Sequence, residues 1–320
     1  MEMPTLTIGT RTSRLPIMQG GMAVRISMSP LAAAVANEGG IGLIAGSGLT
    51  PDELTAEVRA ARTETDGVLG VNIMVAVRGF KELVHAAISA GVDLVVSGAG
   101  FSRDVFGWCR DAGVEMVPIV GSERVAKLSQ HFGASAVVVE GFEAGGHLGT
   151  DEYMLDLLPR IIESVDIPVI GAGGVVTGAD IKRTLDAGAA GVQMGSRFAA
   201  TVESSAPDAF KDMYVRATED DILIIKSPVG LPGRAIRNPF TECLTAGDYP
   251  RIERCEACLK HCGREYCIMD KLIRAQGGDV IDGLVFAGSS AARIHDIPTV
   301  KALMDRLVAQ WRTASEEAPA

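Results

Sequence analysis

The feature that most constrains the fold of this chain is a regular alternation of short apolar segments with helical segments between residues 15 and 198. The apolar segments are rich in Val, Ile and Leu, which is typical of parallel strands buried on both faces. They span 15–22, 40–46, 69–74, 94–100, 116–120, 137–140, 168–174 and 191–198. The segments between them are predicted helices at 30–38, 51–62, 80–90, 102–112, 123–131, 152–164 and 178–187. This repetition predicts an α/β fold with a parallel sheet.

Eight predicted strands are the number that closes a TIM (β/α)8 barrel, and a doubly wound open sheet is the alternative. Nearly every predicted strand carries Gly, Asn, Ser, Glu or Gln at its C-terminal end. Active sites of barrels lie at that end and draw on many strands, whereas an open sheet concentrates such residues at one switch point. The distribution therefore favours the barrel.

The rhythm of strands and helices breaks after residue 198, and this break predicts the domain organisation. We expect residues 1–198 to form the barrel and residues 199–285 to form a smaller inserted lobe that carries a four-cysteine cluster. Residues 286–320 are expected to return to the barrel, where the amphipathic segment 300–311 would be the eighth outer helix.

Composition and charge narrow the class of partner. With 320 residues and 47% hydrophobic content, the chain can bury a large core. A net charge of −10 disfavours a surface that binds nucleic acid or an anionic membrane, because such surfaces are basic. No apolar run is long enough to cross a membrane, and no targeting segment is evident at the start. We expect a cytoplasmic protein with a small-molecule partner, which could also form a homodimer.

The stretch from Val137 to Gly149 is the strongest candidate for a site. Its β-branched run ends at Glu140, and four of the next nine residues are glycines. Glycine lets backbone N–H groups approach a bound group closely, which a Cβ would prevent. His147 lies within this glycine bed, so we expect its imidazole to face the substrate as the catalytic group. The alternative is a histidine that only bonds a neighbouring loop.

Two glycine-rich strand ends indicate a phosphate site. Gly171–Gly174 follow the seventh strand, and Met194–Ser196 follow the eighth. Loops after the last two strands of such barrels commonly bind phosphate through backbone N–H groups. The alternative is that these glycines only make tight turns.

The other strand ends suggest which phosphorylated cofactor would bind. Gly20, Gly21 and Met22 offer backbone for a flat ring, Asn72 offers an amide, and Gln193 or Ser289 could add donors. FMN fits this set. Pyridoxal phosphate would need a lysine at a strand end, and no predicted strand of the barrel has one there.

Together, these motifs resemble the nitronate monooxygenase family, formerly called 2-nitropropane dioxygenases, and the related FMN-dependent enoyl-ACP reductases. The likeness rests on Pro16–Met22, Gly70–Met74, Gly98–Gly100, Glu143–Gly149, Gly171–Gly174 and Gly195–Phe198, in that order. It implies a TIM barrel that binds FMN non-covalently, with His147 facing the reacting carbon. The cofactor-binding residues we expect are Gly20, Gly21, Met22, Asn72, Glu140, Gly145, Gly146, Gly173, Gly174, Gly195, Ser196, Gly288 and Ser289.

A second constellation lies in the predicted lobe. Cys255, Cys258, Cys262 and Cys267 fall within thirteen residues. In a cytoplasmic chain, such spacing indicates metal ligation rather than disulfides. It suits a [4Fe–4S] cluster better than zinc, whose ligands usually come as two separated pairs. The absence of any metal is the third possibility.

Lys226, Arg234 and Arg237 flank a loop rich in Pro and Gly at 227–233. They could hold the phosphate of NAD(P)H, as an electron donor, or of a pantetheine carrier, or they could be solvated charges. The first expected activity is FMN-dependent oxidation of alkyl nitronates to a carbonyl compound and nitrite. The second is NAD(P)H-dependent reduction of an activated C=C bond, such as that of an enoyl thioester. A barrel that binds a flavin or another phosphate ligand without catalysis is the third.

Overall fold

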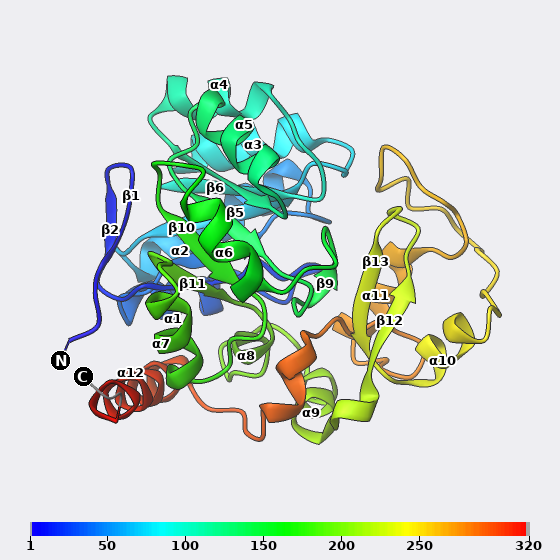
Figure 1. The fold of residues 1–320 in the computed structure, drawn as a ribbon. Coiled ribbons are helices and arrows are strands. Elements are labelled where there is room, and N and C mark those ends of the chain that lie inside the picture. The colour runs from blue at the N-terminus through cyan, green and yellow to red at the C-terminus, as the bar shows by residue number, and fades with distance from the viewer. Residues whose placement is uncertain (1, 318–320) are drawn as a thin grey trace.

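The predicted strands form a parallel ring in the computed structural model, which describes residues 2–317 (Figure 1). They are β3 (Ile17–Gln19), β4 (Gly42–Ala45), β5 (Leu69–Met74), β6 (Leu94–Gly98), β7 (Glu115–Val120), β8 (Val137–Glu140), β10 (Val169–Ala172) and β11 (Gly191–Met194). Their order is β3-β11-β10-β8-β7-β6-β5-β4, and a parallel bridge between Met18 and Ile41 joins the two ends. This ring confirms the TIM-type barrel over the open sheet.

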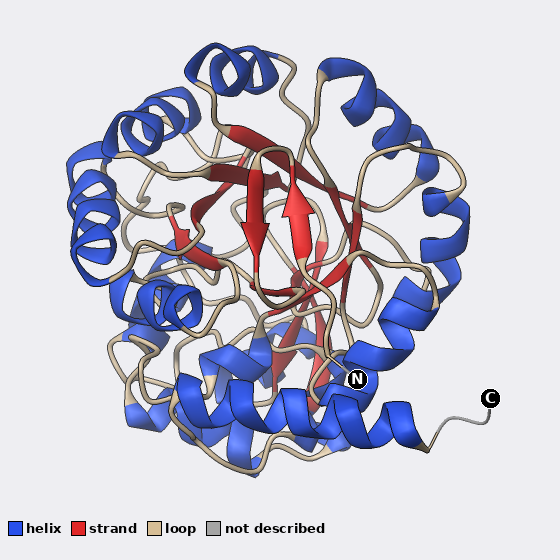
Figure 2. Cartoon of the chain, turned by 90° about the vertical axis from the view of Figure 1, so that its left-hand side faces the viewer, coloured by secondary structure: helices blue, strands red, loops and turns tan. Residues whose placement is uncertain are grey.

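A ring of helices surrounds the barrel (Figure 2). Seven follow successive strands: α1 (Ser29–Asn37), α2 (Pro51–Glu64), α3 (Phe80–Ala90), α4 (Asp104–Ala112), α5 (Glu123–Phe132), α6 (Met154–Ile162) and α7 (Gly178–Asp186). The eighth is α12 (Val300–Glu316), which packs against α7 and α1 as expected. Thr50 and Glu53 form a reciprocal capping box at the start of α2, which explains why the helix begins there.

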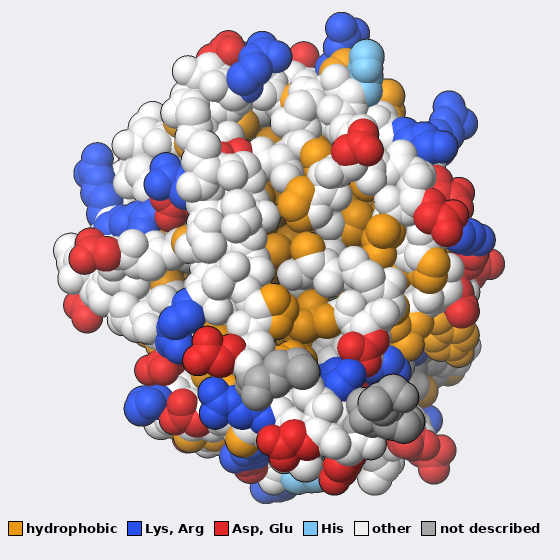
Figure 3. Space-filling view, turned by 60° about the vertical axis from the view of Figure 1, so that its left-hand side comes forward, with side chains coloured by type: hydrophobic (Ala, Val, Ile, Leu, Met, Phe, Trp, Pro, Cys, Tyr) orange, Lys and Arg blue, Asp and Glu red, His pale blue; other side chains and the backbone are white. Residues whose placement is uncertain are grey.

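The N-terminal end of the barrel is closed by a hairpin that was not among the predicted elements. Strands β1 (Leu6–Ile8) and β2 (Arg11–Ser13) pair antiparallel and lie across the barrel opening (Figure 2). Leu6 and Ile8 are buried with Met18, Leu94 and Val138 in the barrel interior. Figure 3 shows this side of the molecule, where acidic and basic side chains are interspersed around the rim. The hairpin does not cover the opposite, C-terminal end of the barrel, where a site can form.

Residues 199–285 form further elements at the C-terminal end of the barrel, on the side of β9 (Gly146–His147) (Figure 1). They are α9 (Asp208–Arg216), the 3-10 helix η1 (Glu219–Asp221), β12 (Ile222–Lys226), β13 (Pro232–Ile236), α10 (Pro239–Thr245) and α11 (Ile268–Gln276). The short helix α8 (Ser196–Ala199) precedes them, and η2 (Ser289–Arg293) follows. Strand β13 pairs with both β12 and β9, so the lobe shares a small sheet with a barrel loop. The domain boundaries themselves stay a prediction, and residues 318–320 lie outside the described chain.

The expected metal centre at the four cysteines is not supported. Cys255 and Cys262 are exposed, and Cys258 and Cys267 are half-buried. Across residues 2–317, no group of three or more His, Cys, Asp or Glu side chains is placed to hold a metal ion. The backbone anchors this segment instead: the carbonyl of Cys258 accepts from the N–H of Arg78 at 2.9 Å. The metal centre therefore stays a prediction from the spacing of the cysteines alone.

Membrane association through a spanning helix was not expected. Within residues 2–317, no helix combines the length and the apolar character needed to cross a bilayer.

Candidate active site

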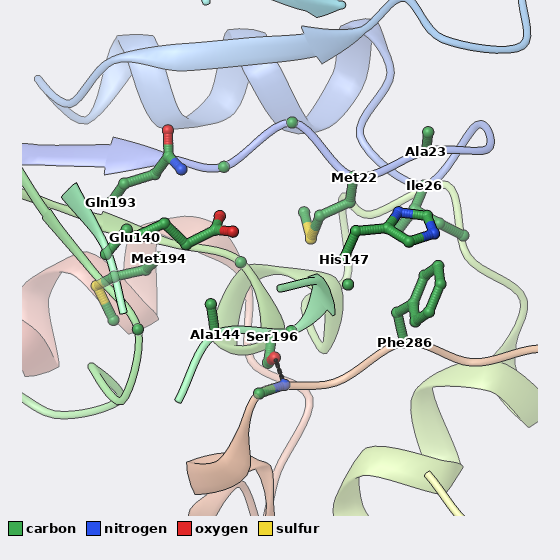
Figure 4. A pocket seen from close by; sticks show the side chains of 18 of the residues that line it. Met22, Ala23, Ile26, Glu140, Ala144, His147, Gln193, Met194, Ser196 and Phe286 are labelled. Atoms are coloured by element: carbon green, nitrogen blue, oxygen red, sulfur yellow. Dashed lines mark hydrogen bonds between the residues drawn. The ribbon is translucent and has the colours of Figure 1, made fainter. Parts of the chain in front are cut away.

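A cavity of about 260 Å³ opens at the C-terminal ends of the barrel strands, and each of the eight strands or the residue directly after it contributes to its lining (Figure 4). This position is where the polar strand ends predicted a site. The predicted residues that line it are His147, Gly20, Gly21, Met22, Asn72, Glu140, Gly145, Gly146, Gly173, Gly174, Gly195, Ser196 and Gly288. Ser289 does not line the cavity. Its N–H donates to the carbonyl of Glu143 at 2.9 Å, and the neighbouring Ser290 faces the cavity instead.

The glycines that line the cavity differ in the physical reason for which a glycine is found there. A Cβ at Gly21 would lie 2.3 Å from the Cβ of Asn72, and one at Gly145 would lie 2.7 Å from the backbone of Ala287 and Gly288. These two glycines allow protein segments to pack closely, rather than only leaving room for a ligand. Gly173 has a φ of +111°, a conformation that L side chains rarely adopt. At Gly146, by contrast, an added Cβ would meet no atom within 4 Å.

The two loops expected to bind phosphate lie on the same side of the cavity. Ser196 opens the short helix α8 directly after β11, and its hydroxyl accepts from the N–H of Gly288 at 2.9 Å (Figure 4). Gly173 and Gly174 line the cavity from the end of β10. The chain therefore returns at Gly288 to the predicted phosphate loops, which lie about 90 to 115 residues earlier in the sequence.

His147 belongs to β9 and is held by groups of the lobe and of the segment that follows it. Its Nε2 lies 2.9 Å from the hydroxyl oxygen of Ser227, and the edge of the Phe286 ring packs on it at a centroid distance of 5.1 Å. Burial lowers the pKa of His147 to about 4, so the imidazole is neutral at physiological pH. The sequence analysis did not identify Ser227 or Phe286, because their approach depends on the pairing of β9 with β13.

Glu140, Gln193 and Asn72 supply the other polar groups of the lining. Burial raises the pKa of Glu140 to about 8, so its carboxyl is mostly protonated at pH 7 and can donate a hydrogen bond. Gln193 Oε1 is buried without a hydrogen-bond partner in the described residues. In Figure 4, Glu140 and Gln193 lie at one end of the view and His147 with Phe286 at the other, with Met22 between them. The cavity thus has two separated polar ends.

The lining has no cationic side chain. Glu140 and Glu143 face the cavity, and no Lys or Arg lines it among residues 2–317. A bound anion would therefore have to be held by backbone N–H groups and uncharged donors rather than by a fixed cation.

Of the two alternatives for the basic side chains, a solvated charge is wrong for Arg234. It is buried, and its guanidinium donates to the carbonyls of Ala144 at 3.2 Å and Phe142 at 2.5 Å. Lys226 lies 3.3 Å from Glu265, and Arg237 lies within 4.0 Å of two carboxylates. Arg234 therefore holds the loop before His147 and is not a solvated charge.

Comparison with known proteins agrees with this geometry. The model of the nitronate monooxygenase family matches residues 5–310. A Mycobacterium tuberculosis (strain ATCC 25618 / H37Rv) protein named (3aS,4S,5R,7aS)-5-hydroxy-7a-methyl-1-oxo-octahydro-1H-indene-4-carboxyl-CoA dehydrogenase is 30% identical, over 92% of each chain. The structure of FabK from Thermotoga maritima is 32% identical with a TM-score of 0.86, over 94% of each chain. A nitroalkane oxidase structure from Streptomyces ansochromogenes is 25% identical with a TM-score of 0.82, over 95% of this chain and 97% of that one. This chain therefore belongs to the nitronate monooxygenase family of oxidoreductases.

Proposed function

We propose that the chain is an FMN-dependent enzyme that oxidises alkyl nitronates. The nitronate anion would give up electrons to the flavin, and oxygen would complete its conversion to a carbonyl compound and nitrite. The observation that carries the proposal is a neutral His147 facing a cavity lined by glycines at the strand ends.

The donors and acceptors of the cavity fit FMN. Gln193 Oε1 is an acceptor without a protein partner, the protonated carboxyl of Glu140 is a donor, and Asn72 can act as both. This set suits the polar edge of a flavin ring. Gly173, Gly174, Gly195, Ser196 and Gly288 would hold the phosphate through backbone N–H groups and one hydroxyl. When bound, FMN supplies the acceptor for one or two electrons.

The low pKa of His147 explains why a nitronate suits this site better than its neutral nitroalkane. A buried imidazole with a pKa of about 4 is a weak base, so it is poorly suited to removing a proton from carbon. A nitronate has already lost that proton. His147 then needs only to donate a hydrogen bond to a nitro oxygen and hold the reacting carbon in place.

A second candidate function is redox chemistry at a thioester-activated C=C bond, with NAD(P)H as the electron donor. The absence of Lys and Arg from the described lining favours it, because the reacting part of a thioester is uncharged. A neutral imidazole could stabilise the developing enolate oxygen by hydrogen bonding. The mycobacterial relative is named for a carboxyl-CoA substrate, which also supports this class.

One anaerobic experiment separates the two functions. The oxidised holoenzyme is mixed in turn with propyl-2-nitronate, NADH and NADPH, and the flavin absorbance is followed. Nitronate oxidation predicts rapid loss of the absorbance with the nitronate alone. Rapid loss with NADH or NADPH, and none with the nitronate, would overturn the first proposal in favour of the second.

A pair of histidine variants tests the site itself. His147→Ala should keep FMN and lose most of the reduction rate with whichever donor works. His131→Ala is the matched control, because His131 lies in the last turn of α5, on the outer ring of helices. Equal rates in the two variants would remove His147 from the mechanism.

A further inference from the structure

We propose that Ser227 of the lobe is a positioning residue for His147, which holds Nε2 and leaves Nδ1 as the ring nitrogen that meets the substrate. The inference rests on the role proposed above for His147 and adds a residue from outside the barrel to the site.

The backbone fixes the relative position of the two residues. His147 pairs with Gly233 in the antiparallel ladder between β9 and β13, and the N–H of Leu148 donates to the carbonyl of Pro232 at 2.9 Å. Ser227 directly follows β12, which is the other neighbour of β13. Arg234 adds side-chain bonds from β13 to the loop before β9. The imidazole and the hydroxyl therefore belong to one small sheet and cannot drift apart independently.

A hydrogen bond donated by the Ser227 hydroxyl to Nε2 of His147 would fix one tautomer of the imidazole. The hydroxyl is buried, with 3% of the residue exposed, and its oxygen accepts from the N–H of Val229 at 3.3 Å. This bond uses one lone pair and leaves the hydroxyl proton free, and in the proposed arrangement that proton points to Nε2 of His147. A neutral imidazole that accepts at Nε2 carries its own proton on Nδ1.

The other ring nitrogen is free for the substrate. Among residues 2–317 the only hydrogen bond of the His147 side chain is that of Nε2, and Nδ1 is not one of the sealed polar atoms that lack a partner. The ring lines the cavity, and Phe286 packs on it at 66° between ring planes, which restricts rotation. Nδ1–H can therefore donate to an oxygen of a nitro group or a thioester carbonyl.

Ser227→Ala tests the proposal in the FMN-loaded enzyme. We expect kcat to fall about tenfold, the usual effect of losing one hydrogen bond of about 1.4 kcal/mol. KM should change less than about twofold, because the serine does not touch substrate. Ser227→Thr keeps a hydroxyl and should recover most of the rate. Thr245→Ala is the matched control, because it removes a hydroxyl of the same lobe that bonds only the carbonyl of Glu242.

Nuclear magnetic resonance of protein labelled with ¹⁵N-histidine gives a readout that does not depend on turnover. The chain has 5 histidines, and a His147→Gln spectrum assigns the resonances of His147 by difference. The wild type at pH 7 should show a protonated Nδ1 and a bare Nε2, whereas Ser227→Ala should show a mixture of tautomers.

Each outcome either supports or refutes the positioning role of Ser227. A wild-type tautomer pattern and wild-type kcat in Ser227→Ala would refute the positioning role. If Ser227→Ala loses its flavin or its fold, Ser227→Thr carries the test, and a Thr variant that keeps flavin but shows mixed tautomers also refutes it. If the wild type turns over no tested substrate, the proposed function fails. The tautomer measurement still tests the contact between Ser227 and His147, because it does not depend on turnover.

Discussion

Replacement of Glu140 by Gln should make the free energy of unfolding less sensitive to pH. Burial in the cavity raises the pKa of this carboxyl from its ordinary value of 4.5 to about 8. In the unfolded chain the carboxyl ionises above 4.5, whereas the folded protein keeps the proton up to about pH 8. The folded state therefore binds more protons in this window, so the stability of the wild type falls as pH rises from 4.5 to 8.

The size of the effect follows from the same pKa. A difference of this size corresponds to about 5 kcal/mol of unfolding free energy when fully developed, at about 1.4 kcal/mol for each factor of ten. Water that enters the cavity reduces this figure, so we expect about 2–3 kcal/mol. Glu140→Gln cannot ionise. It should match the wild type near pH 5 and exceed it by this amount at pH 8.5.

Urea unfolding of the flavin-free protein at pH 5, 7 and 8.5 measures the difference, without the linkage that a bound cofactor would add. Glu253→Gln is the control, because Glu253 is exposed in a loop of the lobe. Parallel pH dependences for Glu140→Gln and the wild type would refute the neutral, buried carboxyl. The suggestion that Glu140 donates a hydrogen bond to FMN would then lose its basis.

Two further variants test how the loops of the site are held. Gly145→Ala would place a Cβ 2.7 Å from the backbone of Ala287 and Gly288, which cannot yield as a flexible side chain could. We expect a loss of about 1–3 kcal/mol of stability and a drop in flavin content by absorbance, and unchanged content would show that the segment at 287–288 does not support the cofactor. Arg234→Lys should lower the melting temperature almost as much as Arg234→Ala, because one ammonium cannot reproduce the fork that donates to Phe142 and Ala144. Full recovery by Lys would show that charge alone matters there.

The features that could be predicted from the sequence are those that follow directly from strand periodicity. The polar and glycine-rich ends of the predicted strands converge on one cavity, because parallel strands of a barrel all point their C-terminal ends the same way. Thirteen predicted residues, from Gly20 to Gly288, line it for that reason. Helix positions were accurate to a few residues, as with α4, which begins at Asp104 rather than at 102.

Contacts between residues distant in sequence could not be predicted in the same way. The four cysteines gave a metal prediction from spacing alone, and no metal-binding group is found across residues 2–317 to support it. Arg234 was expected either to hold a phosphate or to be a solvated charge, yet β13 buries it against the loop before His147. The position of Arg234 depends on the pairing of β13 with β9, which local composition does not specify.

The order of residues alone thus specified the barrel and the ring of strand ends, since a period of strands and helices admits few ways to bury its apolar faces. It also singled out His147 as the one histidine in a glycine bed. The tertiary structure alone decided the protonation of Glu140 and His147 and the contact of His147 with Ser227. Desolvation and long-range strand pairing arise only when segments far apart in the chain close around the same space.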